Sequence, residues 1–141
     1  MLETIVVAID DSEITERVLQ ALQILQIHSE TKIILSYVIP LIPSIREQPE
    51  NQLHADTEPL PHLHIEKKMV SYQSILPARS EIEIVTGDPA EEIIRLANIY
   101  QADLIVIGSR GLTGMNKIIQ GSVSSQVVEN ATCAVLVVKT E

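Results

Sequence analysis

Short aliphatic runs recur along this chain, and segments with helical spacing of their apolar residues separate them. The first run, Ile5–Ile9, is apolar at successive positions, which suits a strand buried between two helix layers. Apolar residues then recur at the spacing of one helix face, at Val18, Leu22 and Leu25. A regular alternation of strands and helices favours a parallel sheet that right-handed crossovers wrap with helices on both faces.

The remaining elements follow the same alternation. We expect strands at residues 5–9, 32–38, 80–85, 104–107 and 134–138, and helices at 13–27, about 62–76, 88–100 and 122–130. Asp88 to Glu91 form a strong helix start, because Asp88 can act as N-cap, proline fits the first turn and Glu91 completes a capping box. The strand at 80–85 is shorter and more polar than the others, so we expect it at a sheet edge.

The chain reads as a single domain over residues 1–141, without an internal repeat or low-complexity tract. Residues 39–61 carry five prolines among polar and charged residues, which predicts a long irregular connection. Hydrophobic residues make up 45% of the chain, enough for a sizeable core, yet it has neither Phe nor Trp. The core is therefore expected to be aliphatic.

Charge and composition narrow the choice of partner. The net charge of −9 repels polyanions, so nucleic acid and anionic membranes are not expected as partners. Aromatic residues make up only 2% of the chain, so stacking on bases is nearly excluded. Cys133 is the only cysteine and cannot form an internal disulfide. The N-terminus lacks a basic region and a signal peptide, and the longest uncharged stretch, residues 33–45, is too short to span a bilayer, which favours the cytoplasm.

A glycine-rich run follows the strand expected at 104–107. Glycines at 108, 111, 114 and 121, then Ser122, lead into the last expected helix. Glycine lets the main chain approach a phosphate, and the N–H groups of a helix start point at it. The run lacks the Gly-Lys-Ser/Thr of a Walker A loop, and it neither follows the first strand nor has the spacing of the dinucleotide fingerprint. If the first and fourth strands are neighbours, Asp10 and this loop face each other across one crevice at the carboxyl ends of the strands.

The spacing Gly108-x-x-Gly111, nine residues, Gly121-Ser122 resembles the nucleotide-binding signature of the universal stress protein (UspA-like) family. The opening Ile5–Ser12, the segment 34–38 and the closing segments 121–124 and 135–138 are similar to that family as well. The resemblance covers nearly the whole chain. It implies a three-layer α/β/α fold of the adenine nucleotide alpha hydrolase-like, Rossmann-like type, with a five-stranded parallel sheet in the order 3-2-1-4-5.

The resemblance also implies the ligand and its contacts. Members with the complete glycine signature bind ATP, which makes ATP, AMP or ADP the expected cofactor, with Mg2+ held through the phosphates. Asp10 would lie near the ribose, Val38 would offer backbone contacts to adenine, and Gly121 with Ser122 would hold phosphates. The site expected in this chain consists of Ala8, Asp10, Val38, Gly108, Arg110, Gly111, Gly121, Ser122, Val123 and Ser124.

Several alternatives stay open. Arg110 and Lys117 either neutralise phosphate charge or are solvated loop cations, and the histidines at 54, 62 and 64 are interpreted as solvated rather than as metal ligands. Ala134 and Asp11 depart from the residues that are frequent in the family, outside the glycine signature. The resemblance implies a homodimer through the strand Ala134 to Val138, which is expected at a sheet edge. The functional hypotheses are an ATP-binding stress or signalling regulator, a slow ATPase without an evident catalytic base, and a nucleotide-independent dimeric interaction module.

Overall fold

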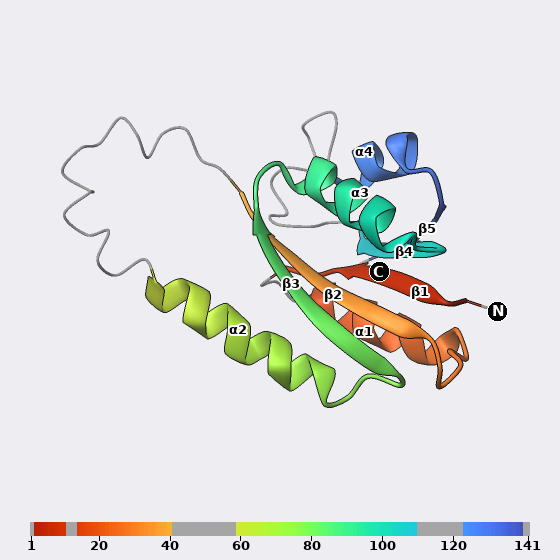
Figure 1. Ribbon diagram of the computed structural model, residues 1–141, viewed down its shortest axis with the longest axis horizontal. Coiled ribbons are helices and arrows are strands. Elements are labelled where there is room, and N and C mark those ends of the chain that lie inside the picture. The colour runs from red at the N-terminus through yellow and green to blue at the C-terminus, as the bar shows by residue number, and fades with distance from the viewer. Residues whose placement is uncertain (1, 11–13, 41–58, 110–122, 140–141) are drawn as a thin grey trace.

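The computed structural model describes residues 2–10, 14–40, 59–109 and 123–139, which form a five-stranded parallel sheet with helices on both faces (Figure 1). The strands are β1 (Thr4–Ala8), β2 (Lys32–Ile39), β3 (Arg79–Thr86), β4 (Leu104–Gly108) and β5 (Ala134–Val138). The helices are α1 (Ile14–Ile24), α2 (Pro59–Gln73), α3 (Pro89–Tyr100) and α4 (Val123–Asn130). The strand order is β3-β2-β1-β4-β5, which confirms the expected order and places both β3 and β5 at edges.

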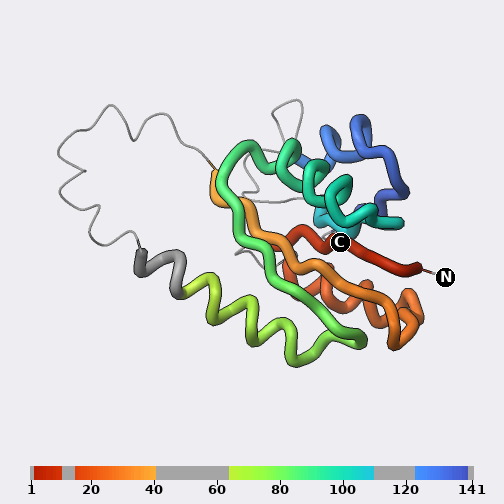
Figure 2. Tube along the Cα trace, viewed as in Figure 1, coloured from red at the N-terminus to blue at the C-terminus, as the bar shows by residue number. Residues whose placement is uncertain are grey.

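Two aliphatic cores flank the sheet, because alternate residues of each strand point to opposite faces. Val7 and Val106 pack on one side with residues of α1 and α2. Val6 and Ile105 pack on the other side with residues of α3 and α4. Figure 2 follows the chain through this arrangement, with α1 and α2 below the sheet and α3 and α4 above it. The central strands are thus buried on both faces, as their uninterrupted apolar sequences predict.

The start of α3 has the predicted geometry. Asp88 adopts an extended conformation, and its carboxylate accepts a hydrogen bond from the Glu91 N–H at 3.1 Å. Pro89 occupies the first turn, where its missing N–H costs no intrahelical bond. Gly87 precedes the cap with φ of 153°, and its N–H donates to Ile39 O at 3.0 Å. This bond joins the turn after β3 to the end of β2.

Two predicted helices have wrong boundaries. The helix expected at 13–27 ends at Ile24, because Gln26 adopts a left-handed conformation with φ of 56°. The helix expected at about 62–76 runs from Pro59 to Gln73. Its beginning accommodates prolines in the first turn, and beyond its end Leu76 still donates to Gln73 O in a tight turn. The strand expected at 80–85 is also longer than predicted, at eight residues.

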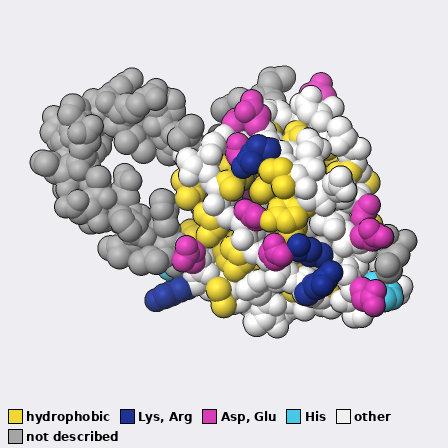
Figure 3. Space-filling view, in the orientation of Figure 1, with side chains coloured by type: hydrophobic (Ala, Val, Ile, Leu, Met, Phe, Trp, Pro, Cys, Tyr) yellow, Lys and Arg dark blue, Asp and Glu magenta, His cyan; other side chains and the backbone are white. Residues whose placement is uncertain are grey.

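The described surface carries charges of both signs. On the face with β3 and α3, acidic and basic side chains are interspersed with hydrophobic ones (Figure 3). Lys32 pairs there with Glu81 at 2.8 Å, and Arg95 pairs with Glu92 at 2.6 Å. Within the described ranges, no helix is both long enough and apolar enough to cross a membrane.

Candidate functional site

Strand β1 ends before its neighbours, and this early end creates the site. Its pairing with β2 stops at Ala8 and Ser36, and its pairing with β4 stops at Ala8 and Ile107. Strand β2 continues to Ile39 alongside β3. The chain order of the sheet reverses at β1, where ligands bind in open parallel sheets.

Along a parallel strand, the N–H and C=O groups of successive residues point alternately to the two neighbouring strands. This alternation determines which groups of β2 and β4 point toward the space beyond the end of β1. Ile9 N donates to Ser36 O at 3.0 Å, so the peptide groups of Ser36 face β1. Those of Val38, two residues further, face the same side, where the ladder with β1 has already ended. On the other side, Ser109 N donates to Val138 O at 2.8 Å, so the peptide groups of the preceding residue, Gly108, face β1. The end of β1 therefore lies between main-chain groups of two neighbouring strands.

A crevice opens at this point. It is lined by Ala8, Ile9, Asp10, Thr15, Val18, Ser36, Val38, Pro89, Ile93, Ile107, Gly108 and Val123. We call this set of residues the β1 crevice. Its walls are mainly aliphatic, and Asp10 is the only ionisable side chain among the described residues that line it.

Asp10 is held by the first turn of α1. Thr15 Oγ1 donates to Asp10 O at 2.7 Å, and Asp10 N donates to Thr15 Oγ1 at 3.3 Å. The hydroxyl also lies 3.3 Å from Asp10 Oδ1. Thr15 is completely buried, so these bonds fix the carboxylate at the end of β1.

The opposite end of the crevice lies between the end of β4 and the start of α4. Val123 begins α4 and lines the crevice. Ser124 is buried, and its hydroxyl donates to Ser109 O at 3.4 Å, which ties the first turn of α4 to the end of β4. The first turn of a helix carries the positive end of the helix dipole.

Half of the residues predicted for the site line this crevice. Ala8, Asp10, Val38, Gly108 and Val123 come together, whereas the Ser124 hydroxyl bonds to Ser109 O just after β4. Four predicted residues lie outside the described ranges: Arg110, Gly111, Gly121 and Ser122. Lys117 and His54 lie outside them as well.

A model of the universal stress protein family matches residues 1–139. The chain belongs to the universal stress protein family.

Curated universal stress proteins match this one over different lengths. Sll1388 of Synechocystis is 30% identical over 154 residues, which covers 96% of each chain. MJ0531 of Methanocaldococcus jannaschii is 51% identical over 57 residues, and there the match spans 40% of this chain and about a third (34%) of the relative.

Solved universal stress proteins share the whole fold. MJ0577 of M. jannaschii has a TM-score of 0.81 at 26% identity, over 99% of this chain and 96% of its own. A universal stress protein solved in complex with cAMP has a TM-score of 0.69 at 25% identity, over 99% and 98% of the two chains. An Arabidopsis thaliana member solved with AMP bound has a TM-score of 0.67 at 25% identity, over 99% and 92%.

Sequence reasoning missed several crevice residues of this universal stress protein. Thr15 and Ser36 supply buried hydroxyls, and Pro89, Ile93 and Ile107 supply apolar wall. A signal for Ser36 was present, because it is a polar residue in an aliphatic strand and lies two positions before Val38, on the same face. The sequence identifies Pro89 only as part of a helix start and Ile93 only as part of its buried stripe. Their second role, in the crevice wall, depends on the packing of α3.

Proposed function

We propose that this protein binds an adenine nucleotide in the β1 crevice, with ATP and Mg2+ as the expected form, and acts as a nucleotide-dependent regulator of stress or signalling. The observation that carries the proposal is the early end of β1. It leaves the main-chain groups of Val38 and Gly108 and the carboxylate of Asp10 around one aliphatic crevice.

The groups of the crevice suit the parts of an adenine nucleotide. The N–H and C=O of Val38 form a donor and acceptor pair that complements N1 and the 6-amino group of adenine. The walls at Ile93 and Ile107 would cover the faces of the base without aromatic stacking. The carboxylate of Asp10 can only accept hydrogen bonds, which suits the hydroxyls of ribose.

Phosphates would lie at the start of α4. Helix N-termini bind anions through free N–H groups and the helix dipole, and Gly121 and Ser122 immediately precede Val123. Arg110 and Mg2+ would offset the phosphate charge against the net charge of −9. The relatives solved with cAMP and with AMP support an adenine nucleotide as the ligand class. Titration with different adenine nucleotides determines how many phosphates the preferred ligand carries.

Equilibrium titration of the full chain tests the proposal, with ATP and Mg2+, ADP, AMP and cAMP as separate ligands. We expect saturable binding at or below millimolar nucleotide, weakened by Asp10→Asn, which keeps the shape of the side chain and removes its charge. Glu30→Gln, an exposed charge removal in the turn before β2, is the matched control and should bind as wild type does. Wild-type protein that binds none of the four nucleotides at millimolar concentration contradicts the proposal.

We propose that the signal is the binding of nucleotide rather than its hydrolysis. Hydrolysis requires an oriented water and neutralised charge, and Asp10, the one described ionisable group of the crevice, is held by Thr15. We therefore expect phosphate release from ATP to be weak. Rapid release that is lost in Gly121→Val would make the protein an ATPase instead.

A homodimer through β5 is part of the same proposal. Because Val138 O faces β4, the peptide groups of Val135 and Val137 face outward from the sheet. Arg17 Nε donates to Lys139 O at 3.0 Å and limits this free edge at one end. Antiparallel pairing of two such edges about a two-fold axis at Leu136 would use both outward residues.

The N–H of Val137 points outward from the sheet, and this provides a specific test of the dimer. Val137→Pro removes an N–H that faces outward and leaves the bonds of β5 to β4 in place. We expect sedimentation to show a dimer for wild type and a monomer for Val137→Pro, with the same circular dichroism. A wild-type monomer at every concentration contradicts the dimer without bearing on nucleotide binding.

A further inference from the structure

A buried serine interrupts the aliphatic floor of the β1 crevice. Ser36 has 1% of its surface exposed and lies on the face of β2 that packs toward α3. Its register partner on β1 is Ala8, whereas the pair two residues before it on that face is Val6 and Ile34. The small pair gives the crevice its depth. A hydroxyl is unfavourable at such a depth unless it is hydrogen-bonded, and alanine would fill the same space.

The hydrogen of this hydroxyl is already used. Ser36 Oγ lies 3.0 Å from Val7 O, and since a carbonyl oxygen can only accept, the serine is the donor. A serine hydroxyl has one hydrogen, so it can offer only lone pairs to a ligand. Thr15 Oγ1 likewise donates to Asp10 O. Both buried hydroxyls of the crevice are therefore acceptors toward whatever enters it.

We propose that Ser36 is a specificity-determining residue that selects 6-amino purines over 6-oxo purines. The inference rests on the proposed function, in which a purine nucleotide enters the crevice. The amino group of adenine carries two hydrogens, so Ser36 Oγ can accept one while the main chain accepts the other. The 6-oxo group of hypoxanthine or guanine would instead meet the lone pairs of Ser36. To donate to that oxygen, Ser36 would have to give up its bond to Val7 O.

The test compares AMP with IMP, which share the ribose and phosphate and differ in the base. AMP has a 6-amino group and a lone pair on N1, whereas IMP has a 6-oxo group and a hydrogen on N1. Calorimetric titration of both ligands is carried out on wild type, Ser36→Ala and Ser74→Ala. Ser74 is the matched control, because its hydroxyl also donates to a main-chain carbonyl, Ser71 O, at 2.6 Å, outside the crevice. Thermal unfolding checks that the variants are folded, and Ser36→Cys, of similar volume with a weaker acceptor, replaces Ser36→Ala if the latter is unstable.

We expect wild type to prefer AMP over IMP by at least about tenfold, because IMP loses the bond to Ser36 Oγ and its N1 hydrogen also faces the N–H of Val38. Ser36→Ala should weaken AMP binding by about three- to tenfold and leave IMP binding unchanged or stronger. The preference should therefore narrow without vanishing, because Val38 still discriminates at N1. Ser74→Ala should keep the wild-type ratio. A folded Ser36→Ala protein that binds AMP and keeps the full preference overturns the role of Ser36 and leaves the proposed function intact. Wild type that binds neither ligand, nor ATP, overturns the proposed function itself.

Discussion

The hydroxyl of Thr15 donates to the main-chain carbonyl of Asp10 and accepts from its main-chain N–H, at 2.7 and 3.3 Å. These bonds close the turn between β1 and α1. Thr15 is fully buried, so water does not readily replace them. The position of the carboxylate at the crevice thus depends on a neutral side chain five residues away.

Replacing Thr15 with valine keeps the shape of the side chain and removes its hydroxyl. We expect Thr15→Val to lose about 1–2 kcal/mol of unfolding free energy, because two main-chain groups of Asp10 lose their partner. Nucleotide binding should weaken several-fold as the carboxylate loses its support. Urea denaturation and titration measure the two effects, and Thr15→Ser, which keeps the hydroxyl, should retain most of the binding. Thr15→Val protein with wild-type affinity would show that the turn does not position Asp10.

Gly87 is required by backbone conformation. Its φ of 153° is rare for residues with a side chain, and an added Cβ would lie 2.9 Å from Glu92 Cγ. We expect Gly87→Ala to lower the unfolding free energy by about 1–3 kcal/mol. The double variant with Glu92→Ala, compared with Glu92→Ala alone, separates the two causes. If the double variant recovers all of the stability in chemical denaturation, side-chain crowding rather than φ is responsible.

Asp88 caps α3, the helix that supplies one wall of the crevice. Its carboxylate accepts from Glu91 N at 3.1 Å. We expect Asp88→Ala to cost about 1 kcal/mol of unfolding free energy, whereas Asp88→Asn should cost less because its side-chain oxygen still accepts. Thermal or chemical unfolding of the two variants checks this. Equal losses in both would assign the effect to charge at the helix end rather than to the cap.

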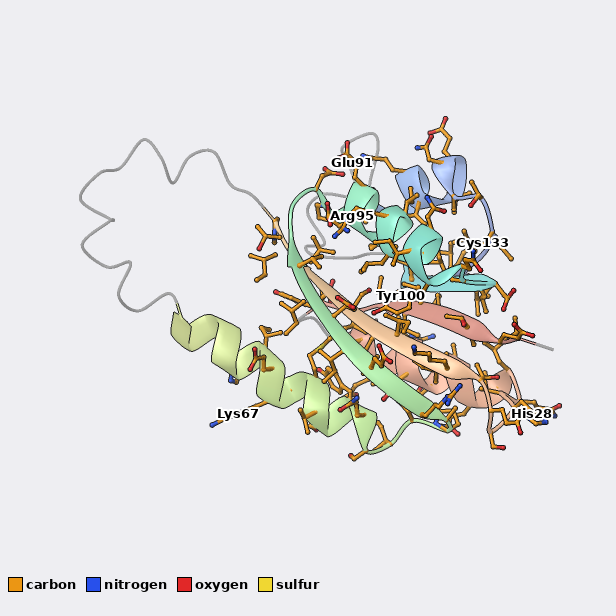
Figure 4. The ribbon with its side chains drawn as sticks, viewed as in Figure 1. His28, Lys67, Glu91, Arg95, Tyr100 and Cys133 are labelled. Atoms are coloured by element: carbon orange, nitrogen blue, oxygen red, sulfur yellow. The ribbon has the colours of Figure 1, made fainter. Side chains whose placement is uncertain are left out.

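Tyr100 predicts a change in stability at alkaline pH. It lies at the end of α3 over the strands (Figure 4), where its hydroxyl donates to the Glu83 carboxylate. This bond, with burial and the charge of Glu83, raises the pKa of Tyr100 from 10.0 to about 12. The folded state therefore holds the proton more tightly than the unfolded state. Its contribution is fully present below pH 10 and is lost as the pH rises from 10 to about 12.

The comparison with Tyr100→Phe measures this contribution. Wild type should lose stability relative to Tyr100→Phe between pH 10 and 12, and the near-ultraviolet absorbance of one phenol should titrate at about pH 12. Glu83→Gln removes the charge and should return the pKa of Tyr100 toward its ordinary value. The assignment to Glu83 is wrong if the high-pH titration is unchanged in Glu83→Gln.

The sequence predicted the fold well because its strongest signals are local and agree with one another. The apolar run at 5–9 and the Asp88–Pro89 helix start each specify an element without reference to the rest of the chain. Helix ends were less predictable. The stop of α1 depends on a left-handed Gln26, and glutamine carries no preference for that conformation.

The candidate site was predicted in part for a related reason. Asp10 and Gly108 follow strand ends, and adjacency of β1 and β4 brings them together, as their positions after parallel strands suggested. Ser36 and Ile93 line the same crevice only through strand phase and helix packing. Those are tertiary properties, and spacing along the chain does not encode them directly.

The early end of β1 also affects how this protein can change over evolutionary time. Where recognition depends on peptide groups, as proposed at Val38 and Gly108, substitution of the side chain removes neither the donor nor the acceptor. Such a surface is robust to mutation. Changes in ligand preference are then confined to the few positions whose side chains form the floor and walls of the crevice. A substitution at Ser36 or Ile93 can alter which ligand is preferred, while the main-chain groups that hydrogen-bond to the ligand remain.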